Sequence, residues 1–317
     1  MTYKQFPKNF NAFMNIINNN INFKYYYNKL KIIQPFDVSL RDGIQNSNFM
    51  SLNQKLNNYN FIKTNHSPSH IEIGSIVSKK KLPIFSNTNK LIEEISTSDS
   101  DYFILFPNLI KLEDYLDKNF GKHSYSFISS VSNTFQLKNI NRTLEQSDEE
   151  IISMIKLIKS NHKDAKIKLY LSCINECPFE GKKTVNCIID KIDYFLKQPI
   201  DFIMLSDTCG SLTTDFFLTL LKKIDTYKYD ISKIGMHFHV KDEKQTEELF
   251  ILSLNYGIRI FDVSEISNGG CSLTLNKKER HGNMSYEQFY KFVLRYLIIY
   301  DNTIKNRRLK GLRSKYI

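Results

Sequence analysis

The sequence predicts an α/β protein built as a (β/α)8 (TIM) barrel, with an N-terminal extension and a C-terminal helical tail. From residue 31 onward, short apolar segments rich in β-branched and aromatic residues alternate with longer segments of helical period. Eight such units fit into roughly 250 residues, which is the usual size of this barrel. An open doubly wound sheet is the competing architecture, but it usually carries G-x-G-x-x-G after its first strand, and this sequence contains no such motif.

The predicted strands are nearly continuous apolar runs, as expected for a parallel sheet that is covered on both faces. They lie at 31–40, 70–75, 101–107, 125–130, 166–174, 201–208, 233–240 and 259–266. The predicted helices lie at 51–63, 87–97, 109–118, 145–161, 183–197, 213–228, 243–256 and 285–300. Asp148 and Asp242 supply negative charge of the kind that favours a helix N-terminus.

The two ends of the chain differ from the barrel at 31–300. Residues 1–30 are rich in Asn, Tyr and Phe, and the first acidic residue of the chain is Asp37. An acid-free start is typical of a mitochondrial transit peptide, but such peptides are usually rich in Arg and this segment has none. We therefore expect 1–30 to be a poorly ordered or helical extension, and 301–317 to be a basic, solvated tail.

Composition narrows the class of protein. The chain has 317 residues, 41% of them hydrophobic, with no run of about 18 apolar residues that would predict a membrane helix. Five cysteines argue against a disulfide framework, so we expect a cytoplasmic protein, with mitochondria as the alternative. The net charge of +11 reflects either coding bias or a preference for a polyanion, such as nucleic acid or a phosphate-bearing small molecule. No nucleic-acid-binding motif is present, so we expect neither a nucleic-acid nor a membrane partner.

A histidine pair is the sharpest chemical signal, and it lies where barrels place their chemistry, at the C-terminal end of a strand. His237 and His239 are two residues apart on one strand and therefore point to the same face. Asp42 can add a carboxylate from across the barrel, and Asn283 a carbonyl oxygen. Nitrogen and oxygen ligands with open water positions suit Mg²⁺, Mn²⁺ or Zn²⁺. Ordinary core or surface histidines are the alternative interpretation, and His281 is a competing ligand.

Further charged residues lie at or just after the ends of the predicted strands 31–40, 70–75 and 201–208. Arg41, beside Asp42, is a permanent cation suited to an enolate that develops near a bound metal. The alternative is a structural salt bridge between the two, which we disfavour because neighbours on a strand point to opposite faces. Glu72 is expected to orient a ligand or relay a proton, or else to cap a loop. Asp207, in SDTCG, is expected to hold a metal-bound water or a substrate hydroxyl.

The cysteines fall into two groups. Cys271 follows two glycines, which permit movement in a loop that can close over the barrel mouth, so its thiol is either reactive or merely small. Cys173 and Cys177 are separated by three residues, without nearby partners that would complete a zinc site. We expect both to be packing or loop residues.

Together these motifs resemble the hydroxymethylglutaryl-CoA lyase family, which is related to the isopropylmalate and homocitrate synthases. DVSLRDGIQN, IEIGSIVS, FPN, YLSCINECPFEGK, SDTCG, HFH and GGC occur in the order of the family's motifs, over about residues 35–300. The combination of CPFEGK with GGC is specific to the lyases rather than to the synthases.

The resemblance implies cleavage of 3-hydroxy-3-methylglutaryl-CoA to acetyl-CoA and acetoacetate, with an acyl-CoA as the molecular partner, and it leaves a homodimer open. The implied cofactor is Mg²⁺ or Mn²⁺. The implied general base is Asp42 or His237. The implied roles are metal binding by Asp42, His237, His239 and Asn283, catalysis by Arg41, Glu72, Asp207, His237 and Cys271, and substrate binding by Arg41, Gln45 and Ser75.

The sequence departs from the family pattern around the substrate. Val240 stands where Asp or Asn is expected, Met204 replaces a small polar residue, and Glu265 and Asn268 replace small residues. The run 272–283 after GGC is bulkier and more charged than usual. These changes predict altered acyl or CoA recognition. The alternatives are therefore a related aldolase or condensing enzyme with another substrate, and a degenerate, non-catalytic barrel.

Overall fold

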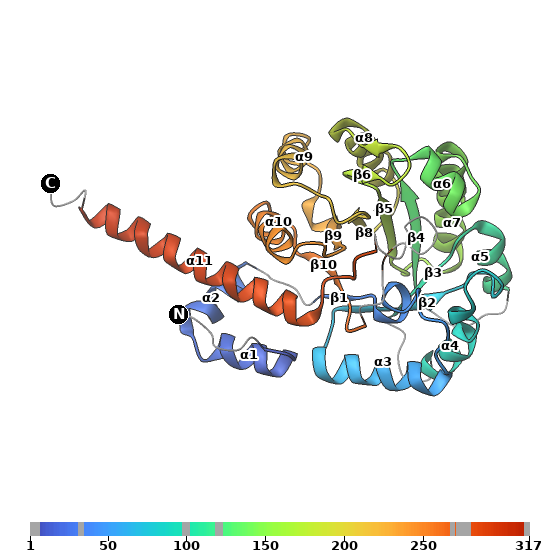
Figure 1. Cartoon of the computed structure of the whole chain (residues 1–317), viewed down its shortest axis with the longest axis horizontal. Coiled ribbons are helices and arrows are strands. Elements are labelled where there is room, and N and C mark those ends of the chain that lie inside the picture. The colour runs from blue at the N-terminus through green and yellow to red at the C-terminus, as the bar shows by residue number, and fades with distance from the viewer. Residues whose placement is uncertain are drawn as a thin grey trace.

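The computed structural model describes residues 7–30, 35–96, 102–117, 123–266, 270 and 280–313. Eight strands close into a barrel in the order β1-β10-β9-β8-β5-β4-β3-β2, and the neighbouring strands in it are parallel. Helices surround this sheet on the outside (Figure 1). The predicted (β/α)8 barrel is confirmed.

The strands of the barrel fall at the eight predicted places, and most are shorter than predicted. They are β1 (Phe36–Asp37), β2 (His70–Ser75), β3 (Tyr102–Leu105), β4 (Ser124–Ser130), β5 (Ile167–Ser172), β8 (Phe202–Asp207), β9 (Ile234–Phe238) and β10 (Ile260–Val263). A small antiparallel hairpin that the sequence reading missed, β6 (Glu176–Cys177) and β7 (Gly181–Lys182), follows β5. Cys177 in β6 is buried, in agreement with the expected packing role of that residue.

The helices of the barrel also follow the prediction, with one addition. They are α3 (Leu52–His66), α4 (Thr88–Ser96), α5 (Leu109–Leu116), α6 (Asn133–Ile140), α7 (Leu144–Asn161), α8 (Val185–Leu196), α9 (Thr214–Thr226), α10 (Glu243–Asn255) and α11 (Tyr286–Arg313), with single 3₁₀ turns at Pro83–Phe85 and Ile231–Lys233. The short helix α6 was not predicted. Asp242 caps α10 by accepting the Gln245 N–H, as expected. Asp148 does not cap α7; it lies inside the helix and accepts from Ser129 at 2.8 Å.

Two helices precede the barrel and pack on it, α1 (Phe10–Asn18) and α2 (Ile21–Lys29). The side chains of Phe13 and Ile17 are each 1% exposed and belong to the main hydrophobic core. The Phe13 ring stacks on Tyr290 of α11, with 4.9 Å between ring centroids. Figure 1 shows both helices beside α11. The described part of the N-terminal segment is therefore an integral, helical part of the fold.

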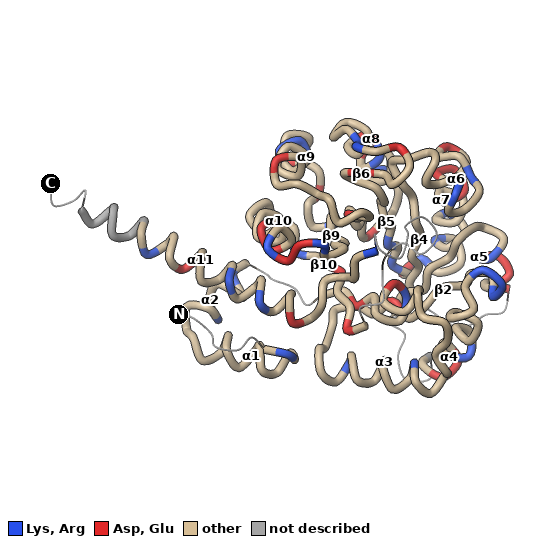
Figure 2. Tube along the Cα trace, in the orientation of Figure 1, with Lys and Arg blue, Asp and Glu red and all other residues tan. Residues whose placement is uncertain are grey.

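The last helix, α11, continues past the boundary predicted between residues 300 and 301 and projects beyond the barrel (Figure 1). Basic and acidic residues alternate over the outer helices, whereas α1 and α2 carry no acidic residue (Figure 2). Within the described residues, no helix combines the length and apolar character needed to cross a membrane.

The segment after β1 corrects the first predicted strand. Residues 31–34 lie outside the described residues, and β1 ends at Asp37. Ser39–Gly43 then forms a turn of π-helix instead of extended strand. A Cβ at Gly43 would clash with the Ser264 hydroxyl and the Ile266 carbonyl, so this turn packs directly against the segment that follows β10. The turn carries Arg41 and Asp42 to the mouth of the barrel.

Met204 lies in the barrel interior and not at the substrate pocket, which corrects the prediction for this residue. Its side chain is fully buried in a cluster with Leu105, Tyr170 and Ile260. Gly235 on the neighbouring strand makes room, because a Cβ there would lie 2.5 Å from the Met204 sulfur. This departure from the family pattern is therefore a matched packing change below the pocket.

Candidate active site

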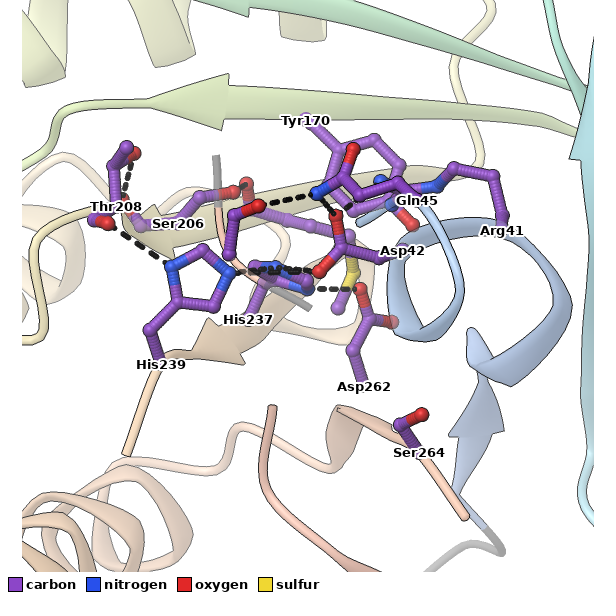
Figure 3. Close-up of polar contacts among 12 residues, drawn as sticks. Arg41, Asp42, Gln45, Tyr170, Ser206, Thr208, His237, His239, Asp262 and Ser264 are labelled. Atoms are coloured by element: carbon purple, nitrogen blue, oxygen red, sulfur yellow. Dashed lines mark hydrogen bonds and ion pairs between the residues drawn. The ribbon is translucent and has the colours of Figure 1, made fainter. Parts of the chain in front are cut away.

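Three predicted metal ligands meet at the C-terminal end of the barrel. His237 is on β9, His239 follows that strand directly, and Asp42 comes from the π-turn after β1. The Nε2 atoms of the two imidazoles are 3.2 Å apart. Asp42 Oδ2 lies 3.7 Å from Nε2 of His237 and 3.5 Å from Nε2 of His239 (Figure 3). Among the described residues these three form a group able to hold a metal ion, and His281 is not part of it.

The hydrogen bond at Nδ1 of each imidazole determines its tautomer, and therefore whether its Nε2 atom carries a proton or a lone pair. His239 Nδ1 lies 3.0 Å from the Thr208 carbonyl oxygen, which can only accept, so Nδ1 carries the proton. His237 Nδ1 lies 2.9 Å from Asp262 Oδ2 in the same arrangement. Both Nε2 lone pairs therefore face each other and the Asp42 carboxylate. Three converging acceptors repel one another unless a cation lies between them, so the donor set fits a divalent metal ion.

Electrostatics also favour a positive charge at this point. Burial alone would raise the pKa of Asp42, but the Arg41 guanidinium and the two imidazoles hold it well below its ordinary value. Burial lowers the pKa of His239, yet the Asp42 carboxylate outweighs this and the net shift is upward. The carboxylate is therefore ionised and able to act as a ligand.

Asn283 lies next to the three predicted ligands, because its backbone forms a β-bridge with that of His239. The residue is 3% exposed, and among the described residues neither its side-chain oxygen nor its nitrogen has a hydrogen-bond partner. A buried amide without partners costs free energy unless a ligand completes it. This observation favours the ligand role of Asn283, which stays a prediction.

Two of the three guanidinium nitrogens of Arg41 form ion pairs within the described residues. Nη1 donates to Asp42 Oδ1 at 2.7 Å and Nε to Glu72 Oε2 at 2.8 Å, and the guanidinium stacks 4.5 Å from the centre of the Tyr170 ring. The salt bridge to Asp42 that we disfavoured is thus present, because the two residues share a turn of helix and not a strand. Nη2 is buried and has no hydrogen-bond partner within the described residues.

A cavity of about 260 Å³ opens over these groups. Its walls include Arg41, Asp42, Gln45, Ser75, His237 and His239, which joins three of the four predicted metal ligands to the three predicted substrate-binding residues. The fourth, Asn283, does not line this cavity. Tyr170 and Thr208 also line it, and Asn108, Phe135 and Ile140 extend it away from the metal ligands. The cavity is partly apolar, as is usual for a pocket that binds a small molecule.

Two predicted catalytic carboxylates lie outside the cavity wall. Glu72 is fully buried behind Arg41 and accepts from the Tyr170 hydroxyl at 2.5 Å. Asp207 accepts the backbone N–H groups of Ser211 at 3.0 Å and Leu212 at 3.1 Å, and burial raises its pKa to about 6. Each carboxylate thus has a structural task in this arrangement, and their catalytic roles stay predictions.

Gln45 connects the metal centre to the loop that carries Cys271. Its Nε2 donates to Asp42 Oδ1 at 2.6 Å and to the Gly270 carbonyl at 2.8 Å. Asn46 donates to the same carbonyl at 3.0 Å. Cys271 itself lies outside the described residues. Gly270, the residue before it, is nevertheless hydrogen-bonded to Gln45 and Asn46, close to Asp42.

Sequence reasoning missed four residues around the site. Thr208 and Asp262 hold the imidazoles, Tyr170 supports Arg41, and Lys168 pairs with Asp262 at 2.7 Å. Two of them had a usable signal, because Lys168 and Asp262 interrupt apolar strand segments. A charge inside a buried strand requires a partner.

Comparison with known proteins identifies a matching family and relatives. The HMGL-like family model matches residues 32–305. The mitochondrial hydroxymethylglutaryl-CoA lyase of Arabidopsis thaliana is 27% identical over 265 residues, which is 81% of this chain and 53% of that protein, so the chain spans about half its length. The cytoplasmic 3-hydroxy-3-methylglutaryl-CoA lyase of Mus musculus is 25% identical over 80% of this chain and 72% of that protein.

Solved structures agree on the fold. A hydroxymethylglutaryl-CoA lyase from Pseudomonas aeruginosa superposes with a TM-score of 0.74 at 23% identity, covering 83% of this chain and 85% of that one. An HMG-CoA lyase from Acinetobacter baumannii, in complex with coenzyme A and 3-methylmalate, gives a TM-score of 0.69 at 23% identity, covering 81% of each chain. Both support the barrel architecture.

Proposed function

The chain belongs to the HMGL-like family, and from that premise we propose that it is a divalent-metal-dependent carbon–carbon lyase. The proposed reaction cleaves 3-hydroxy-3-methylglutaryl-CoA, or a similar 3-hydroxyacyl-CoA, to acetyl-CoA and a keto acid, which is acetoacetate for the first substrate. One observation carries the proposal. A metal-binding group of Asp42, His237 and His239 shares one cavity with an Arg41 guanidinium that is within hydrogen-bonding distance of Asp42.

The chemistry divides between the metal and the protein. When bound, a Mg²⁺ or Mn²⁺ ion would act as a Lewis acid toward the substrate oxygens. Asp42, His237 and His239 would hold it, with Asn283 as the proposed fourth ligand. The C3 hydroxyl loses its proton to a general base, for which Asp42 and His237 are the candidates, and its oxygen becomes the new ketone. The electron pair of the breaking C–C bond moves onto the thioester oxygen, and the enolate then takes up a proton to give acetyl-CoA. Nη2 of Arg41, which has no partner among the described residues, is proposed to donate to that oxygen.

Arg41 is suited to this role because it needs no rearrangement. Glu72 and Asp42 each occupy another nitrogen of the guanidinium, and Tyr170 covers its face. A donor that is already oriented stabilises developing charge without a reorganisation cost. Gln45 and Ser75 line the same cavity and are proposed to contact the acyl group.

A basic rim supports an acyl-CoA as the substrate class. Lys81 and Lys111 line the outer part of the active-site cavity. A second cavity of about 450 Å³, lined by Lys79, Lys80 and Lys111, shares Ser75 and four further wall residues with the first, Lys111 among them. A thioester at the metal centre would thus extend toward four amines, a setting that favours a carrier with phosphate groups.

The rim gives a prediction that separates binding from chemistry. Changing Lys79, Lys80 and Lys81 to Ala is expected to raise KM for the CoA ester about tenfold, equivalent to about 1.4 kcal/mol, with kcat changed less than twofold. KM for a short thioester without phosphates should stay constant. The matched control changes the exposed Lys156, Lys163 and Lys222, which line neither cavity. An equal rise of KM in both triple variants would show a general charge effect and contradict the rim.

The central test is direct. Purified protein is incubated with 3-hydroxy-3-methylglutaryl-CoA and Mg²⁺ or Mn²⁺, and acetoacetate is measured. We expect cleavage that a chelator abolishes and added metal restores. Tight metal binding without cleavage would move the proposal to another hydroxyacyl thioester, as for a related aldolase or condensing enzyme. The unusual run 272–283 after GGC motivates that second candidate. Absence of metal binding would favour a non-catalytic barrel.

We also propose that helices α1 and α2 stay with the mature protein, because their side chains complete the core. For its location we propose the cytoplasm, as in the name of the mouse relative, with mitochondria as the alternative, as in the name of the Arabidopsis relative.

A further inference from the structure

A buried ion pair lies inside the barrel beneath the metal-binding group. Lys168 on β5 and Asp262 on β10 are 0% and 1% exposed, and Nζ lies 2.7 Å from Asp262 Oδ1. Strands β8 and β9 separate β5 from β10 in the sheet, so the pair crosses the barrel interior. Neither residue lines the active-site cavity, and the proposed reaction uses neither of them.

The two oxygens of Asp262 have different partners. Oδ1 accepts from Lys168, and Oδ2 lies 2.9 Å from Nδ1 of His237 (Figure 3). The ammonium group is held over the rings of Phe36 and Tyr170, at 3.3 and 4.6 Å from their centres. Because Lys168 can only donate, it fixes which oxygen of Asp262 remains for the imidazole and how the carboxylate is turned.

This arrangement controls the metal side of His237. A carboxylate oxygen at Nδ1 selects the tautomer with the proton on Nδ1, which leaves the Nε2 lone pair facing His239 and Asp42. His239 is oriented differently, by the backbone carbonyl of Thr208. Of the two imidazoles, His237 is therefore the one whose orientation depends on side chains.

Burying two charges is costly unless the charges are paired and hydrogen-bonded, and apolar residues often replace such pairs without loss of stability. A role in stability alone is therefore a weak reason for this pair. We propose that Lys168 and Asp262 are positioning residues, which hold the tautomer and orientation of His237 and thereby set the affinity of the site for its metal ion. The inference rests on the metal site of the proposed function, not on the identity of the substrate.

The experiment uses the full chain and does not require turnover. Asp262→Asn alone would leave a buried, unpaired ammonium, which destabilises a fold strongly. The main variant is therefore Lys168→Met with Asp262→Asn, which removes both charges at similar volume. The dissociation constant for Mn²⁺ is measured calorimetrically without substrate. Histidine ring tautomers are read by nitrogen-15 NMR of the metal-free protein.

We expect the double variant to bind Mn²⁺ about 10–100-fold more weakly, as is typical when the partner of a ligand histidine is lost. The His237 signals should change from the Nδ1–H form to a mixture, while those of His239 stay constant. Lys168→Arg keeps the charge and should bind within about threefold of the wild type. Lys55→Met is the matched control, since Lys55 is another buried lysine, bonded to Ile84 and Asn87 and absent from the cavity wall.

Three results would overturn the proposal. The first is a folded double variant with wild-type Mn²⁺ affinity and an unchanged His237 tautomer. The second is an equal loss of affinity in Lys55→Met, which would indicate general destabilisation. The third is a wild-type His237 without the proton on Nδ1. None of these readouts depends on cleavage of an acyl-CoA, so failure of the proposed reaction would be seen separately.

Discussion

Replacing Arg41 by Met is expected to lower kcat by about 10²–10⁴-fold while the protein keeps its metal ion. The magnitude is the range for losing a charged donor to an oxygen that becomes negative in the transition state. The structure supports a specific atom for this role, because Nε and Nη1 are occupied and the buried Nη2 has no partner among the described residues. Turnover, metal content after gel filtration and melting temperature are measured together.

Arg41→Met also removes the ion-pair partner of the buried Glu72 carboxylate, which requires a control. Glu72 is 0% exposed, and a buried charge that loses its partner can destabilise a protein by about 3–5 kcal/mol. Adding Glu72→Gln to Arg41→Met removes this charge and is expected to restore the melting temperature but not kcat. A change of kcat below about threefold in the stable double variant would refute the role of Arg41 at the enolate.

His239→Ala is the second change with a large expected effect, and it acts on metal binding before catalysis. The variant loses one of three converging donors, so we expect the dissociation constant for Mn²⁺ to rise more than about 100-fold, beyond the usual effect of losing only the partner of a ligand. Asp42 Oδ2 and His237 Nε2 would remain, with Asn283 as the proposed further ligand, so the ion would lose one of its two imidazole ligands. Metal content after dialysis and calorimetry provide the measurement.

His281→Ala is the matched control. His281 is half-buried near Gly210, but it is outside the metal-binding group of the described residues. It should retain metal affinity within about threefold. Unchanged metal content in His239→Ala would contradict the ligand assignment, and loss of metal in His281→Ala would replace His239 by the competing ligand considered from the sequence.

The sequence by itself was sufficient to predict the barrel and all three residues of the metal-binding group, Asp42, His237 and His239. Strands and helices have different hydrophobic periods, and these are visible in consecutive residues. The spacing of His237 and His239 places both on one face of a strand, whatever the rest of the fold does. Parallel strands in a closed barrel also bring their C-terminal ends to one rim, which is why Asp42 was expected opposite the histidines.

The rest of the site could not be predicted because the backbone departs locally from regular strands. Arg41 and Asp42 form an ion pair because the backbone makes a π-turn at Ser39–Gly43, where a strand would have separated the two side chains. Asp207 ends its strand with both oxygens bonded to the following turn, so its position in SDTCG did not reveal its contacts. Met204 faces the barrel interior because Gly235 on the next strand leaves space for it.

What only the tertiary structure decided is the set of partners behind the predicted residues. Lys168 and Asp262 are 94 residues apart in the chain, and Tyr170 and Glu72 are 98 apart. Such contacts depend on how far each strand is staggered when the barrel closes, and a shift of one residue would turn every one of these side chains to the other face of the sheet. The hydrophobic period identifies the strands, but it gives no information about the register between neighbouring strands. The interior ion pair that orients His237 was therefore visible only once the barrel was closed.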